Sequence, residues 1–445
     1  MMPGFLAGAG SLDGVARAIV ARSTEAEALE AWAVDRRSNL LEDTHGLDVA
    51  EVRGSPAAAY AYYEDGEEVE GKTFEGFLTG PEAPWASEWG LATTVGDLAN
   101  LIARVPAEAR KARVVLLGHS LGASIVEAYS AWDFGGRPGF SEIAALVLAD
   151  GVARNEGAPP ESVNRAEYEQ GGASGPFPSP GVETGIREGQ TFVALPLLGT
   201  KALVVAETVA IAARNRPGEI TSGPPVRDQL LSLVLGVPAV PRLTNAAAFG
   251  FAFDEDSAVL SFAAARCGAG TGGPITPYTG AFGGQLLQPS DPSATYGWLD
   301  GPSVGEPTRI ADLARAWFEG PGLNFAEWYF PQRLPIDVRA AGTLTIAEDD
   351  WRFSVYGLRA RFGAEIDIPI YAAPFRLVGD PTAYDALRAL VKTPPEAFVV
   401  GNYPDLAHID GLVGADVPGS AAKTFYDDLV AFVRARTPPG GVVVP

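Results

Sequence analysis

Residues 113–132, RVVLLGHSLGASIVEAYSAW, combine a strand pattern, a glycine-bounded turn and a helix pattern. Residues 113–117 form a β-favouring apolar run, which predicts a strand buried on both faces of a sheet. Residues 121–132 have helical character. Between them, Gly118-His119-Ser120-Leu121-Gly122 predicts a tight turn, because glycines on either side leave space for a sharp change of direction.

Further along the chain the same alternation continues. Residues 143–149 (IAALVLA) predict a second buried strand, which ends at Asp150. Strand, helix and buried strand in succession predict an α/β fold with a mostly parallel sheet and helices on both faces. Other predicted strands lie at 29–34, 366–373 and 396–400, and other predicted helices at 12–22, 94–104 and 420–436.

The alternation stops after Asp150 for about 215 residues that are rich in glycine and proline. Helix-like pieces occur at 201–213 and 308–318, whereas 268–284 (GAGTGGPITPYTGAFGG) is expected to be a loop. We therefore expect one core, built from 1–150 and 366–445, that is interrupted by a large mixed cap or lid at 151–365.

Composition limits the possible partners of this chain. Its 445 residues carry a net charge of −22, so nucleic acids and anionic membranes are not expected to bind. No apolar run reaches 18 residues, which argues against an integral membrane span. One cysteine excludes an internal disulfide, and no cysteine–histidine cluster has zinc spacing. The first residues lack the charged segment of a signal peptide, and neither localisation nor oligomeric state can be predicted.

Ser120 is the predicted nucleophile, because the turn exposes its hydroxyl beside the positive end of a helix. A serine hydroxyl needs a base, and the chain has only three histidines. His119 is adjacent in sequence, so its side chain is expected to point elsewhere, and His45 lies in an early loop. His408 follows the last strand pattern, at the sheet edge that should also hold Ser120. We therefore predict that His408 is the base.

Three aspartates compete for the role of the acid that orients His408. Asp380, in RLVGDPTAYD, is the first choice because it follows a predicted strand and gives the chain order Ser, Asp, His. Asp150 at the end of the preceding strand and Asp385 remain alternatives. The stretch AAPFRLVGD is longer than a strand-to-acid connection usually is, which keeps the choice open.

Other motifs carry weaker signals. The GAGTGG stretch at 268–273 lacks the strand and helix that a phosphate-binding loop requires. Acidic clusters at 254–256 and 348–350 are more typical of solvated loop ends than of calcium sites. The aromatic segment EWYFPQRL at 327–334 has two interpretations, the lining of an acyl pocket or plain core.

Several segments together resemble the α/β-hydrolases of the lipase and esterase kind. They are PGFLAG (3–8), DRRSN (35–39), GHSLG (118–122), GD (379–380) and AHIDGLVGADVP (407–418). The last segment is similar to the histidine loop of the acid-lipase group. The resemblance covers the core, about half of the chain, and does not extend to the cap.

This resemblance implies an α/β-hydrolase fold and an acyl-enzyme on Ser120, formed from a small-molecule or lipid-like ester without a metal or organic cofactor. Pro3-Gly4 corresponds to the oxyanion loop, so the backbone N–H groups of Phe5 and Leu121 are the expected oxyanion donors. A strand should precede Pro3, and we expect the N-terminal strands of the fold to be missing from this sequence. An acyltransferase and a non-catalytic binding protein with the same scaffold are the alternatives.

Overall fold

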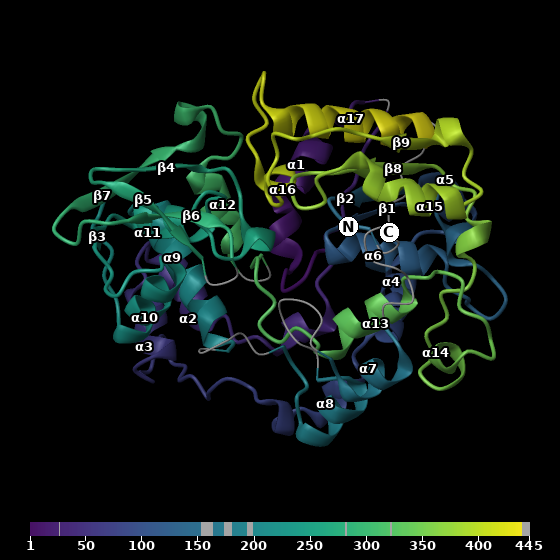
Figure 1. The fold of residues 1–445 in the computed structure, drawn as a ribbon, viewed down its shortest axis with the longest axis horizontal. Helices are drawn as coiled ribbons and strands as arrows, with labels where there is room; N and C mark the ends of the chain where they lie inside the picture. Colours follow the sequence, from purple (N-terminus) through teal and green to yellow (C-terminus); the bar gives the residue numbers. More distant parts are fainter. Residues whose placement is uncertain are drawn as a thin grey trace.

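The computed structural model describes residues 1–25, 27–152, 163–172, 180–193, 199–280, 283–320 and 323–437. Its main sheet has four parallel strands in the order β1-β2-β8-β9 (Figure 1). The strands are β1 (Val115–His119), β2 (Ala145–Ala149), β8 (Ile370–Ala373) and β9 (Phe398–Val400). The predicted α/β architecture with a parallel sheet is thus confirmed.

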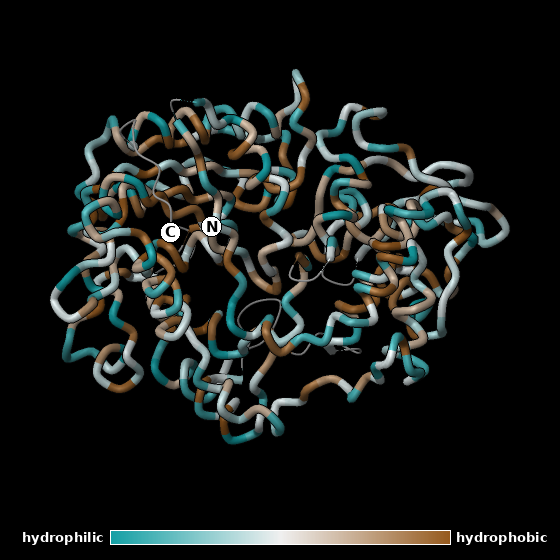
Figure 2. The backbone as a smooth tube through the Cα atoms, turned by 180° about the vertical axis from the view of Figure 1, so that it is seen from behind, coloured by the Kyte–Doolittle hydropathy of each residue, from teal (hydrophilic) through white to brown (hydrophobic). Residues whose placement is uncertain are grey.

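Alternate residues of each strand enter two separate hydrophobic cores, one on each face of the sheet. Leu117, Val147 and Tyr371 belong to the first core, whereas Leu116 and Leu146 belong to the second. Because both faces are covered, β2 is buried along its whole length, as its apolar sequence predicts. Hydrophobic segments gather around the sheet and inside the neighbouring lobe, and many outer loops are hydrophilic (Figure 2).

Helices supply the opposite walls of both cores. The first face is covered by α1 (Asp13–Ala21), α16 (Asp410–Val413) and α17 (Ala421–Arg436). The second face is covered by α4 (Leu91–Ile102), α6 (Leu121–Ser130), α13 (Arg333–Ala341) and α15 (Asp385–Leu390). The helices predicted at 12–22, 94–104 and 420–436 are therefore confirmed, with ends that differ by up to three residues.

A second lobe stands beside the sheet in Figure 1. It contains α2 (His45–Val52), α3 (Ala57–Tyr63), α9 (Lys201–Asn215), α10 (Pro225–Val234), α11 (Asn245–Phe253) and α12 (Ile310–Trp317). It also holds β3 (Arg242–Leu243), β7 (Thr295–Asp300) and β4 (Gly268–Thr271), and the hairpin of β5 (Ile275–Thr279) with β6 (Gln285–Pro289). The remaining α-helices are α5 (Ala107–Arg113), α7 (Arg165–Gln170), α8 (Val182–Glu188) and α14 (Trp351–Ser354).

Two local predictions are wrong. Residues 268–280 are not a continuous loop, because β4 pairs with β7 and β5 pairs with β6. Residues 29–34 form no regular strand; they are extended, and Val34 N–H donates to Met1 O at 3.1 Å. Met2 in turn forms a parallel bridge with Gly118 of β1, so the N-terminal residues lie against the main sheet.

No helix in the described ranges is both long enough and apolar enough to cross a membrane.

Replacing Leu148 by alanine tests whether β2 is the centre of the core. Leu148 is fully buried in this strand, so we expect Leu148→Ala to lower the free energy of unfolding by about 2–5 kcal/mol. Urea denaturation measures the change. Val399→Ala on β9, where the side chain is 37% exposed, is the control and should cost less than about 1 kcal/mol. Equal losses for the two variants would contradict the assignment of β2.

Candidate functional site

Ser120 occupies the predicted turn between β1 and α6. Its backbone has φ +55° and ψ −126°, a conformation that L residues rarely adopt and that persists only where the surrounding structure imposes it. The Ser120 N–H donates to Ala149 O of β2 at 2.9 Å, which fixes the turn against the neighbouring strand. The serine therefore sits at the carboxyl edge of the sheet and at the N-terminus of a helix.

The N-terminal loop packs directly on the Ser120 turn. A Cβ atom added to Gly4 would lie 2.9 Å from Ser120 Cβ and 3.4 Å from its Oγ. A Cβ atom added to Gly122 would lie 2.2 Å from Met2 O, too close for any side chain. Glycine at both positions thus allows the loop predicted to hold an oxyanion to approach the serine.

His408 is held by a carboxylate at the same edge of the sheet. The His408 ring and the Asp150 carboxylate are both buried, and Nδ1 donates to Asp150 Oδ2 at 2.6 Å. Asp150 follows β2 immediately, and its backbone N–H donates to Ala373 O of β8 at 2.8 Å. Ser120 and Asp150 thus follow the neighbouring strands β1 and β2, and His408 is held at the same edge of the sheet by its hydrogen bond to Asp150. In the described part of the chain, the hydrogen-bond partner of the His408 ring is the Asp150 carboxylate.

The loop after β8 completes the surroundings of Asp150 with backbone donors. Asp150 Oδ1 accepts from the N–H groups of Phe375 at 2.7 Å and Val378 at 3.0 Å. Its Oδ2 accepts from Leu377 N–H at 3.3 Å as well as from His408. Hydrogen bonds of this kind are strong when the acceptor is a carboxylate, so Asp150 and the loop after β8 hold each other in place.

Asp380, the preferred acid in the sequence analysis, lies elsewhere. It is exposed, and its carboxylate accepts from Thr382 N–H at 2.8 Å at the start of a short 3-10 helix, Pro381–Tyr384. Asp385 begins α15 and faces Arg388. Neither aspartate reaches His408 because of the path of the chain after β8. The backbone N–H groups of residues 375–378 donate to Asp150, and Asp380 lies beyond this turn. Asp150, the alternative acid, is the residue that meets His408.

The other two histidines have structural partners. His119 is buried, and its Nε2–H donates to His408 O at 2.9 Å, which helps to hold the backbone of the His408 loop. Burial lowers the pKa of His119 well below its usual value, so this imidazole stays neutral. His45 begins α2 and its Nε2 donates to Val69 O at 2.7 Å, so it does not join Ser120.

Asp410 is an anchor of the His408 loop that the sequence analysis did not identify. Its buried carboxylate accepts from Ala407 N–H at 2.7 Å, Arg266 N–H at 2.9 Å and Thr308 Oγ at 2.6 Å. Burial raises the pKa of Asp410 to about 7. The sequence analysis contained Asp410 only as part of AHIDGLVGADVP, the segment that is similar to the acid-lipase histidine loop. Through Asp410, the histidine loop is tied to the lobe that contains α9–α12.

Arg36 holds the N-terminal loop from the opposite side. Its guanidinium is buried, pairs with buried Glu327 at 2.5 Å, and donates to Pro3 O at 2.7 Å and Gly4 O at 3.0 Å. Glu327 also accepts from Ser38 Oγ. The peptide between Gly4 and Phe5 is trans, so the Phe5 N–H points away from Arg36, opposite to the Gly4 carbonyl. The sequence analysis named Arg36 and Ser38 only as parts of DRRSN, and Glu327 only as part of EWYFPQRL.

Leu121, the other expected oxyanion donor, is the first residue of α6. Its N–H belongs to the first turn, where no carbonyl of the same helix can accept it. The Phe5 ring packs edge-on against Phe330, with centroids 4.9 Å apart, and against Phe262 at 5.7 Å. Leu121 is thus fixed by α6, and Phe5 is fixed by its contacts with Phe330 and Phe262.

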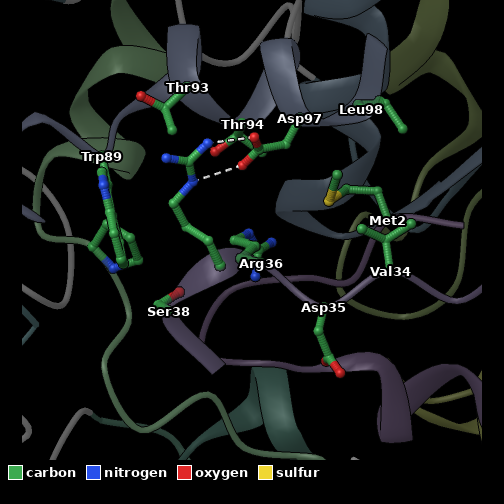
Figure 3. Close-up of a pocket in the computed structure, with 12 residues that line it drawn as sticks. Met2, Val34, Asp35, Arg36, Ser38, Trp89, Thr93, Thr94, Asp97 and Leu98 are labelled. Carbon is green, nitrogen blue, oxygen red and sulfur yellow. Dashed lines mark hydrogen bonds and ion pairs between the residues drawn. The ribbon is translucent and has the colours of Figure 1, made fainter. Parts of the chain in front are cut away.

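A small cavity lies on the Arg36 side of the N-terminal loop (Figure 3). Its lining includes Met2, Arg36, Trp89 and Asp97. Its volume is about 20 Å³, room for little more than one water molecule. This cavity is therefore too small for a substrate.

A comparison with models of known protein families found no match for this chain, and a search of functionally curated proteins found no significant relative. The chemistry of the site must therefore be argued from its geometry.

Removing the Arg36 guanidinium tests its role as an anchor. In Arg36→Met, Glu327 stays buried without its cationic partner, so the free energy of unfolding should fall by about 3–5 kcal/mol at pH 8. Arg53→Met, which breaks an ion pair with both side chains about half exposed, is the control and should cost less than about 1 kcal/mol. Urea denaturation measures both variants.

The pH dependence of the Arg36→Met loss identifies Glu327 as its cause. Burial raises the pKa of Glu327 above its usual value, and Arg36 opposes that rise. Without Arg36 the pKa rises further, so the folded variant binds a proton that the unfolded chain has released. Stability then falls as pH rises above the unfolded value of about 4.3. A variant that is equally destabilised at pH 5 and pH 8 would contradict this account.

Proposed function

We propose that this chain is a serine hydrolase with an α/β-hydrolase fold that cleaves carboxylic esters. The observation that carries the proposal is the buried hydrogen bond between His408 Nδ1 and Asp150 Oδ2, formed at the sheet edge where Ser120 has its positive φ. A nucleophile on a strand-to-helix turn, a histidine and an acid that orients it make up the catalytic triad of such enzymes. In this proposal Asp150 replaces Asp380 as the acid.

In the first half of the reaction, Ser120 Oγ attacks the ester carbonyl carbon and His408 Nε2 accepts the serine proton. The carboxylate of Asp150 holds the other ring nitrogen as N–H and stabilises the imidazolium that forms. The tetrahedral intermediate then collapses to an acyl-enzyme, and His408 returns the proton to the leaving alcohol. Attack by water, with His408 again acting as base, releases the acid and restores Ser120.

The oxyanion of each intermediate needs donors placed before the reaction begins. Leu121 N–H, in the first turn of α6, is one proposed donor, and it is reinforced by the helix dipole. Phe5 N–H is the other, since the Gly4 carbonyl is turned to Arg36 and Gly4 lies against Ser120. One such donor is worth about 2.7–4 kcal/mol of barrier height.

The two aspartates give a direct test of the proposed triad. Asp150→Asn should lower kcat for p-nitrophenyl butanoate roughly 10⁴-fold, because the amide cannot hold His408 in the required tautomer. Asp380→Asn is the matched control. Asparagine at position 380 can accept the same hydrogen bond from Thr382 N–H, because asparagine and aspartate are equally good helix caps. The kcat of this variant should stay within about twofold of the wild type. If Asp380→Asn loses activity and Asp150→Asn keeps it, the assignment of the acid is wrong.

Covalent labelling tests the nucleophile and the base separately. A fluorophosphonate should modify Ser120, as located by mass spectrometry of peptides, and neither Ser120→Ala nor His408→Ala should react at a measurable rate. Absence of labelling in the folded wild-type protein would reject the hydrolase and leave a non-catalytic binding protein. Transfer of the acyl group to an added alcohol in preference to water would identify an acyltransferase instead.

A further inference from the structure

An apolar cavity lies outside the proposed triad, in the lobe beside the sheet. Its volume is about 110 Å³, and all eighteen residues that line it are aliphatic or aromatic. They come from α9, α10, α11 and α12, from residues 259–263, from Phe325, and from the N-terminal loop at Phe5 and Leu6. Because water in such a space would find hardly any hydrogen-bond partner, the cavity favours a hydrocarbon occupant.

Two walls of the cavity are continuous with the proposed catalytic loops. Phe5 contributes its ring to the lining, and the preceding residue, Gly4, lies against Ser120. On the other side, the lining segment 259–263 runs into Ala264, whose carbonyl accepts from Ile409 N–H at 3.1 Å. Ile409 directly follows His408. The lining of the cavity thus includes the residue that follows Gly4 in the N-terminal loop, and Ala263, which precedes the residue bonded to the His408 loop.

We infer that this cavity is the binding site for the acyl chain of the substrate ester, an inference that rests on the proposed function. With the carbonyl at Ser120, the chain passes the rings of Phe5 and Phe262 and ends between α9 and α11. The site therefore takes an unbranched aliphatic acyl group, and the alcohol part of the ester lies outside it.

The size of the cavity limits the length of that chain. An engineered apolar cavity of about 150 Å³ takes up the six carbon atoms of benzene, so about 110 Å³ gives room for about four carbon atoms. In this inference the carbonyl carbon and the first methylenes lie between Ser120 and the cavity. Each methylene that leaves water for such a site should raise kcat/KM about fourfold. Activity should therefore increase from p-nitrophenyl acetate to the octanoate and level off for longer chains.

A substitution that fills the cavity tests its role. Ala206 lines the cavity from α9 and is only half-buried, so Ala206→Phe can place its ring in the open space. If the ring removes room for about three methylenes, kcat/KM for the octanoate ester should fall about 60-fold. Turnover of the acetate ester, whose acyl group is too short to reach the filled space, should fall much less than turnover of the octanoate ester. Ala431→Phe, at an exposed position of α17, is the matched control and should leave the whole profile unchanged.

Binding without catalysis separates this inference from the proposed function. The Ser120→Ala variant should bind octanoate, as measured by isothermal titration calorimetry, and an added Ala206→Phe should abolish binding. Ala252→Phe, on the opposite wall formed by α11, repeats the test if the first variant does not fold.

The outcomes are distinct. Binding that Ala206→Phe abolishes, in a protein with no esterase activity, would reject the hydrolase and retain a fatty-acyl site. Active enzyme with equal rates from acetate to octanoate would overturn the inference and leave the hydrolase standing. Equal losses on acetate and octanoate in both filling variants would also overturn it, because the substitutions would then act on the Ser120 turn and not on chain binding.

Discussion

The carboxylate of Asp150 is the point on which the arrangement of the site depends. It lies at the end of β2, beside the Ser120 turn, and accepts from His408 Nδ1 and from backbone N–H groups of the loop after β8. A buried carboxylate is costly unless such donors surround it. The loop at 375–378 and the His408 loop must therefore take the positions that satisfy Asp150. The local sheet edge, and not chain order, decides which acid meets the histidine.

A second constraint acts on the other side of Ser120. Gly122 lets Met2 approach α6, and Gly4 lets the N-terminal loop lie on the serine itself. Arg36 draws the Pro3 and Gly4 carbonyls to the far side of that loop. Since a trans peptide directs its N–H opposite to its carbonyl, one buried cation sets the direction of the Phe5 N–H. Donors for an oxyanion can be arranged in this way without a polar side chain beside the nucleophile.

The sequence predicted the parts of the site whose signals are local. Strand β1, the turn at Ser120 and α6 follow from residues 113–132, and the scarcity of histidines directed attention to His408. The choice between Asp150 and Asp380 depends on the path of residues 374–380, and backbone N–H donors leave no trace in side-chain pattern. Strands β4 and β5 were missed for a related reason. The glycines of β4 fit under neighbouring rings, as Gly270 does against Phe251, and Pro277 of β5 pairs with Leu287 of β6. Tertiary packing thus overrides the weak strand propensity of both segments.

Phe5 connects the two inferences drawn from this structure. Its backbone belongs to the loop that Arg36 orients, and its ring forms part of the apolar cavity and packs on Phe262. In the proposed enzyme, an acyl chain that fills the cavity would press on the same residue that supplies an oxyanion donor. Binding of the acyl chain, far from the reacting carbonyl, would then restrict the position of that donor. Such binding raises kcat only if it stabilises the transition state more than the bound substrate. Asp410 makes a parallel connection, because it ties the His408 loop to the same lobe. The N-terminal loop and the His408 loop, on the two sides of the proposed reaction centre, are thus both connected to the lobe that contains the proposed acyl-chain site.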